Sequence, residues 1–103
     1  MAGEYAKKIE YLAKPFIELG IYDSPEKFLR DVVRELARNK IKNYERTVRR
    51  FEEKYKASFE EFTKRIEGKA TPKLEDDWMR WEAALNMLLA WRKAREEIDV
   101  SAA

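Results

Sequence analysis

The sequence predicts an all-α fold. Apolar residues recur every three or four positions along most of the 103-residue chain, which is the spacing of one face of an α-helix. No segment alternates apolar and polar residues over the length of a strand. Most of the glycines and prolines stand where a helix would begin or end. These boundaries predict a single all-helical domain, residues 1–103, with one long central helix and helices over about 4–19, 25–56, 59–67 and 72–98.

The first segment, about 4–19, has one apolar face, and Gly20 after it suits a left-handed C-terminal cap. Pro15 falls inside the segment, and a proline in a helix interior kinks or splits the helix. Residues 1–20 therefore form either one kinked helix or two helices. The residues of the apolar face are Tyr5, Ile9, Leu12, Phe16 and Leu19.

The second segment, about 25–56, opens with Ser24 as N-cap and Pro25 at the first helical position, where a missing N–H costs nothing. From Ala37 onward its apolar residues repeat every 3.5 positions, as in helices that pair by knobs-into-holes packing. A helix of this length would span about 45 Å. We therefore expect its end to project or to be covered by a second chain, in a bundle that dimerisation completes. The residues of this seam are Ala37, Ile41, Tyr44, Val48, Phe51 and Tyr55.

The two later segments also carry start signals. Ser58 and Glu61 form a capping box before the segment at about 59–67, and Gly68 suits its left-handed cap. Thr71 and Pro72 repeat the N-cap and first-position pair at the start of the segment at about 72–98.

The last segment contains the stretch DDWMRWEAALNMLLAW, which is apolar nearly all round the helix. One arc is an ordinary core-facing stripe. The adjoining arc is predicted to meet a partner chain, because a helix that is apolar on nearly all sides is buried on nearly all sides. The alternative is that all three tryptophans fill the core of the monomer. The core-facing arc comprises Trp78, Trp81, Leu85, Leu88 and Leu89, and the predicted partner interface comprises Met87, Trp91 and Ile98.

Two charged clusters have competing interpretations. The carboxylates of LEDDW suggest a Mg²⁺ site, but consecutive helical residues point about 100° apart, so helix-start charge is the better interpretation. A basic face on the second segment suits either nucleic-acid phosphates or a solvated surface that forms salt bridges with interleaved acids. These acids are Glu35, Glu45, Glu52 and Glu53. The residues of the basic face are Arg38, Lys42, Arg46 and Arg49.

Composition excludes several classes of function. The chain has no cysteine and no histidine, which removes thiolate metal sites, the commonest metal ligand and the usual general base. We therefore expect no catalytic residues, no metal and no cofactor. The net charge of +2 is weak support for nucleic-acid binding. The chain lacks a membrane span and a signal-peptide core, so a cytoplasmic location is expected. Absent glutamine and abundant Lys, Arg and Glu favour a thermophilic source.

The stretch LGIYDSPEKFLRDVVRELARNKIKNYE resembles the N-terminal half of small antitoxins from prokaryotic type II toxin–antitoxin modules. FEEKYKASFEEF and EDDWMRWEAA are similar to short archaeal and bacterial antitoxin-like helical proteins. The resemblance implies dimerisation through the N-terminal helices and a C-terminal region that blocks a toxin. Ribbon-helix-helix antitoxins begin with a strand that enters the major groove, whereas YAKKIEYLAKPF has helical periodicity.

The sequence therefore predicts a non-enzymatic, antitoxin-like interaction module that forms a homodimer and neutralises a small toxin protein. The alternative is a small helical nucleic-acid-binding protein that uses the basic face of the long helix. Contact with a membrane is not expected.

Overall fold

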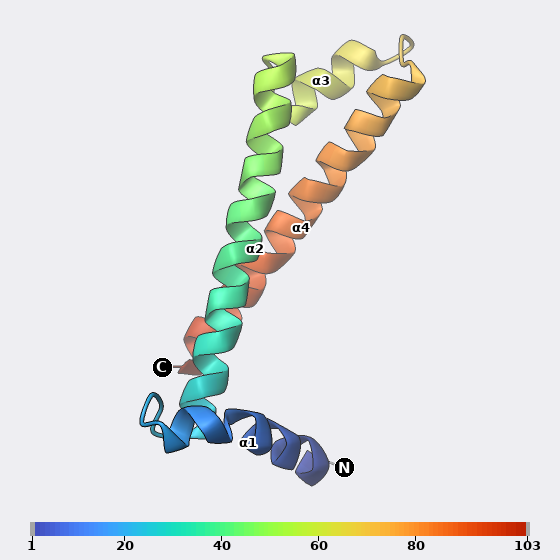
Figure 1. Ribbon diagram of the computed structural model, residues 1–103. Coiled ribbons are helices and arrows are strands. Elements are labelled where there is room, and N and C mark those ends of the chain that lie inside the picture. The colour runs from blue at the N-terminus through green and yellow to red at the C-terminus, as the bar shows by residue number, and fades with distance from the viewer. Residues whose placement is uncertain (1, 103) are drawn as a thin grey trace.

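The protein consists of four α-helices in a computed structural model that describes residues 2–102 (Figure 1). They are α1 (Ala2–Glu18), α2 (Pro25–Tyr55), α3 (Phe59–Ile66) and α4 (Pro72–Ala102). No strand occurs within the described residues, which confirms the all-α prediction. The helix boundaries lie within a few residues of the predicted ones, and Met1 and Ala103 of the predicted domain fall outside the described part of the chain.

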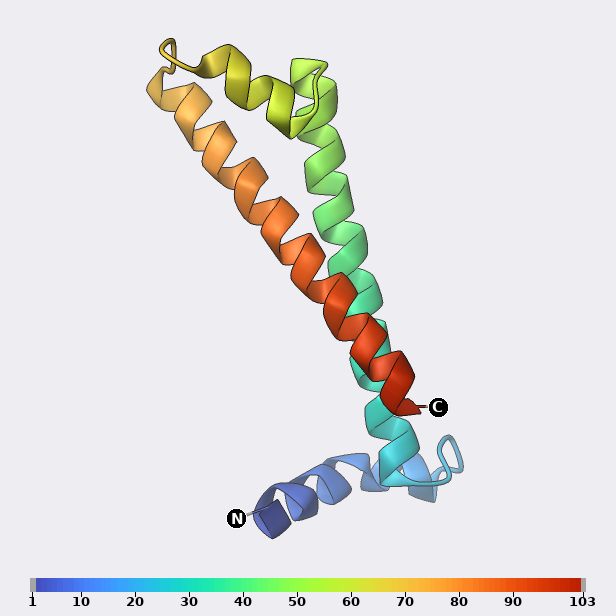
Figure 2. The same ribbon diagram turned by 180° about the vertical axis from the view of Figure 1, so that it is seen from behind.

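The molecule is an elongated hairpin. Helices α2 and α4 run antiparallel, α3 joins them at one end, and α1 lies across the other end beside the start of α2 (Figures 1 and 2). The extents are 60 × 27 × 23 Å and the radius of gyration is 19.8 Å, whereas a compact chain of this length would have about 13 Å. The elongation follows from the two 31-residue helices, each about 46 Å long.

Local capping fixes where the helices begin. The N–H groups of Lys27 and Glu61 donate to the hydroxyls of Ser24 and Ser58 at 3.2 and 3.1 Å. The N–H of Leu74 donates to the Thr71 hydroxyl at 3.3 Å. Each bond satisfies a donor that the first turn of a helix leaves without a backbone partner. The three predicted N-caps, Ser24, Ser58 and Thr71, are confirmed.

The turns after the helices use left-handed backbone. Gly20 and Gly68 have φ values of 77° and 74°, as predicted for C-terminal caps. Lys56 ends α2 with φ 51° without being a glycine, and no sequence pattern predicted this left-handed residue. Helix α1 continues through Pro15 as one helix rather than two.

The hydrophobic core lies at the α3 end of the hairpin. Trp81 is fully buried there, with the Phe51 ring stacked at 5.6 Å and the Phe59 and Phe62 rings at 5.4 and 5.3 Å between centroids. Within the seam predicted on α2, three residues are buried and the other three are half-buried against the same core, so the seam faces α4 of its own chain. The buried cluster comprises Ile41, Val48, Phe62, Trp81, Ala84 and Leu88.

Two apolar stripes lie differently from the prediction. Leu89 was expected in the core-facing arc but is 71% exposed, because α2 and α3 cover a narrower arc of α4 than the predicted one. On α1 the fully buried residue is Ala13. Helix α1 rests on α2 with the arc that carries this small residue, so Leu12 and Leu19 are 65% and 75% exposed.

Replacing Trp81 by alanine should destabilise the fold by about 3–5 kcal/mol, because it removes the ring that α2 and α3 pack around and leaves a cavity. Leu89→Ala on the same helix should change the free energy of unfolding by less than about 0.5 kcal/mol. Urea denaturation of both variants at one protein concentration measures the difference. Equal losses would contradict the placement of the core.

Candidate partner-binding groove

Two clefts open between α2 and α4. The cleft nearer α1 has a volume of about 470 Å³ and is mainly apolar. The cleft nearer α3 has a volume of about 350 Å³, and three of its five lining residues are cations. The first is lined by Glu26, Leu29, Arg30, Val33, Ala94, Glu97, Ile98 and Ser101, and the second by Thr47, Arg50, Phe51, Lys54 and Arg80.

Both clefts open on the same side of the hairpin. In paired helices with a 3.5-residue repeat, residues seven positions apart lie on the same side. Val33 of the first cleft and Thr47 of the second are fourteen positions apart on α2. Arg80 and Ala94 show the same relation on α4, with Met87 midway between them. We call this side of the hairpin the hairpin groove.

The middle of the hairpin groove is apolar and only partly covered. Leu36, seven positions after Leu29, is 46% exposed, and Met87 is 40% exposed. No described segment of the chain lies over them. The apolar middle comprises Leu36 and Met87, which lie between the clefts, together with the apolar residues of the α1 cleft, Leu29, Val33, Ala94 and Ile98. Lys40 and Asn43 lie on the same rows of α2, toward the basic end.

The predicted partner interface is divided by the structure. Ile98 lines the apolar cleft, and Met87 is exposed in the same groove. Trp91 is half-buried and packs against the core cluster, so part of its surface serves the monomer. The sequence prediction missed the α2 side of the groove, Leu29 and Val33. Both could have been recognised from their spacing, because each lies a multiple of seven positions from a residue of the cleft near α3. Val33 is 14 positions from Thr47, and Leu29 is 21 positions from Arg50.

The two ends of the hairpin groove carry opposite charge. Glu26 and Glu97 line the cleft near α1, with Arg30 beside them; we call this the acidic end. Arg50, Lys54 and Arg80 line the other cleft and form the basic end. Arg50 makes no ion pair with any described residue.

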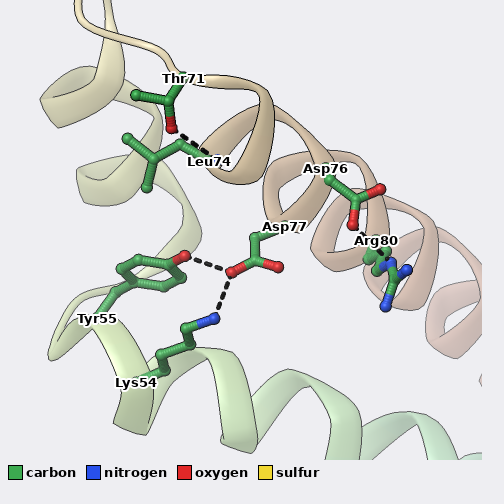
Figure 3. A network of polar contacts seen from close by, with 7 residues as sticks. All are labelled: Lys54, Tyr55, Thr71, Leu74, Asp76, Asp77 and Arg80. Atoms are coloured by element: carbon green, nitrogen blue, oxygen red, sulfur yellow. Dashed lines mark hydrogen bonds and ion pairs between the residues drawn. The ribbon is translucent and has the colours of Figure 1, made fainter.

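The remaining cations of the basic end are partly neutralised by α4. The Lys54 ammonium donates to Asp77 at 2.7 Å, and Nε of Arg80 pairs with Asp76 at 3.0 Å (Figure 3). Most of the Arg80 side chain, 70%, remains exposed. Its terminal nitrogens are therefore open to a further acceptor.

Asp77 is the only charged residue among the described residues that is buried. Lys54 and the Tyr55 hydroxyl, from the end of α2, both donate to it (Figure 3). The hydrogen bond from Lys54, and then that from Tyr55, lowers the pKa of Asp77, and Asp77 raises the pKa of Lys54. The helix-start interpretation of this acidic stretch omitted this tertiary contact. We infer that the network fixes the position of α4 along the axis of α2.

The predicted basic face lies on the surface of α2, outside both clefts. Arg38 pairs with Glu35 at 3.1 Å, while Lys42, Arg46 and Arg49 are exposed and make no ion pair with the described residues. Glu45 pairs across the hairpin with Arg92 at 3.2 Å instead. One of the four cations of the basic face is therefore paired with an acid as the salt-bridge interpretation expected, and the other three are not.

A second uncovered surface lies on α1. It comprises Tyr5, Leu12, Phe16 and Leu19, and we call it the α1 stripe. Phe16 also stacks on Phe28 of α2 at 4.8 Å, so it anchors α1 as well as contributing to the surface. The other three side chains point away from the described chain, with exposed fractions of at least 65%.

The comparisons with known proteins give no relative. No family model, curated protein or solved structure matches the chain. Among the described residues, no group of His, Cys, Asp or Glu side chains is placed to hold a metal ion. None of the helices has the length and apolar character that a bilayer crossing requires. The uncovered surfaces, the hairpin groove and the α1 stripe, are therefore the candidate functional sites.

Asp77→Asn should lower the melting temperature at neutral pH and lose that effect in acid. Because the pKa of Asp77 is lower in the folded chain than its ordinary value of 3.8, its carboxylate stabilises the fold above about pH 4, and this contribution fades as the pH falls through the folded-state pKa. Asp76→Asn, at an exposed pair, is the control. Melts of both variants from pH 2 to pH 7 would refute the network if the curve of Asp77→Asn ran parallel to wild type.

Proposed function

We propose that the protein acts by protein–protein contact, as an antitoxin-like homodimer that binds and neutralises a small toxin protein. The observation that carries the proposal is the amount of surface that the chain leaves uncovered. It exposes 8187 Å², whereas a compact chain of 12.3 kDa exposes about 6,100 Å². The excess of about 2,000 Å² is comparable to what each chain of an obligate homodimer buries, about 1,000–2,500 Å².

The uncovered surface is apolar in two separate places, which favours two kinds of contact. The apolar middle of the hairpin groove lies between two parallel rows of side chains, as a helix-binding groove does. The α1 stripe lies at the end of the molecule, on a helix that packs mainly on α2. We assign the groove to the homodimer and the α1 stripe to the toxin.

This assignment follows the antitoxin resemblance in part. The resemblance implies dimerisation through the N-terminal helices, and the groove uses the first half of α2 in that way. It implies a toxin contact in the C-terminal region, whereas the α1 stripe is N-terminal. The stripe is favoured here because Leu12 and Leu19 have large exposed fractions and no structural role within the described chain.

Nucleic-acid binding has less support. The basic face offers three unpaired cations, Lys42, Arg46 and Arg49. Strong phosphate binding requires a larger excess of positive charge over a surface, and the whole chain carries only +2. This alternative predicts a steep loss of affinity with salt, which protein–protein contact through apolar stripes does not.

A growth-rescue assay tests the proposed function. The full chain, carrying an affinity tag, is cross-linked in its native cells, and the small protein recovered in stoichiometric amount is expressed alone and with this chain. We expect the partner alone to arrest growth and the pair to grow. Leu12→Asp/Leu19→Asp should abolish rescue, because two charges then lie in the apolar contact, while the melting temperature stays near that of wild type.

Asn39→Asp/Asn86→Asp is the matched control, since both positions are exposed and the added charge is the same. It should rescue growth as well as wild type does. A recovered partner that does not arrest growth would contradict the antitoxin proposal. Rescue by Leu12→Asp/Leu19→Asp would show that the toxin binds elsewhere.

A further inference from the structure

We propose that a second copy of this chain packs face to face and antiparallel on the hairpin groove, so that the basic end of each copy meets the acidic end of the other. The inference rests on the homodimer of the proposed function and specifies its interface. It commits to the hairpin groove, and to two-fold symmetry, in which the same surface of both chains forms the contact.

The apolar middle of the groove provides the central contact. Leu36 and Met87 are the most exposed of its side chains, and they flank the line between α2 and α4. A second hairpin laid on this line would cover both and produce a four-helix arrangement in which each α2 and α4 has neighbours on two sides. An antiparallel copy brings Leu36 of one chain near the level of Met87 of the other, close to the two-fold axis.

The charges of the groove select the antiparallel orientation. A parallel copy would place Arg50 and Arg80 against the same arginines of its partner, and like charges at close range are unfavourable in an interface. An antiparallel copy places them against Glu26 and Glu97 of the partner. Arg50 has no carboxylate partner among the described residues, and most of Arg80 is exposed. Both arginines can therefore form ion pairs with carboxylates of the partner.

The spacing along the helices is compatible with this pairing. Glu26 and Arg50 are 24 positions apart on α2, which corresponds to about 36 Å along the helix axis. The ion pairs Arg34–Asp99 and Glu45–Arg92 fix α4 against α2. They place Ala94 near the midpoint of that span, within the apolar middle. Arg80 and Glu97 are 17 positions apart on α4, so the midpoint of their span lies near residue 88 rather than at Ala94. A two-fold axis between the two midpoints brings each arginine to within about one helical turn of a partner carboxylate.

The uncovered area agrees with a second copy as the occupant. The chain exposes 8187 Å², an excess of about 2,000 Å² over a compact chain. The α1 stripe accounts for part of this excess, and a partner about as long as the hairpin can cover the part that lies along the groove. A short helical peptide would cover the apolar middle and leave the two charged ends unmatched.

A charge-exchange experiment tests the interface. The basic-end variant is Arg50→Glu/Arg80→Glu, and the acidic-end variant is Glu26→Lys/Glu97→Lys. Each alone should weaken self-association at least about tenfold, because both ends of its dimer then bring like charges together. An equimolar mixture should form a heterodimer about as tight as the wild-type dimer, since opposite charges meet at both ends. Native mass spectrometry distinguishes the three species by mass.

Arg49→Glu/Lys93→Glu is the matched control, with the same change of charge at exposed positions outside the groove. It should dimerise like wild type, and thermal melts of all variants establish that they fold. A wild-type dimer that both variants leave unchanged, or a mixture without preferred heterodimer, would overturn the interface while leaving the proposed homodimer intact. A wild-type monomer at every concentration up to about 1 mM would overturn both, and the growth-rescue assay would still test the toxin contact separately.

Discussion

The burial of Trp81 joins three of the four helices, because the indole of α4 lies among aromatic rings from α2 and α3. Large aromatic side chains dominate core energetics through the area that they bury. Here that area is concentrated at one end of a hairpin 60 Å long. The Asp77 network lies at the same end and fixes α4 against Lys54 and Tyr55. The fold is therefore anchored at the α3 end, and the rest of the hairpin extends from that anchor.

The other end of the hairpin has no comparable anchor, and this asymmetry underlies the proposed function. Beyond the core, α2 and α4 continue side by side with small or partly exposed residues between them, such as Ala37 and Ala94. The helix pair contributes stiffness and length, while the apolar middle of the hairpin groove remains uncovered. A second copy would supply there what α3 supplies at the anchored end, namely a further helix against both members of the pair.

Much of the fold was predictable because its signals are local. Capping residues such as Ser24 and Thr71 act within one turn, and the 3.5-residue repeat from Ala37 onward is visible along one helix. Periodicity identifies an apolar arc but does not say how wide an arc the neighbours cover, so Leu89 was wrongly placed in the core. The contact between Asp77 and Tyr55 joins residues 22 positions apart, and a capping pattern cannot reveal it. The groove residues on α2, Leu29 and Val33, were missed because they lie beside the predicted seam. They line a groove only once α4 packs next to α2 and forms its other side.

Hydrogen exchange measured as a function of protein concentration tests most directly whether the α1 end of the hairpin depends on a second chain. Association slows exchange only where it closes amides that open locally in the single chain. We predict that amides in residues 25–36 of α2 and 92–102 of α4 become more protected as the concentration rises through the dimer dissociation constant. Amides around the Trp81 core, in residues 41–55, should be protected at the lowest concentration and change little. Protection that is uniform along both helices and independent of concentration would contradict the account.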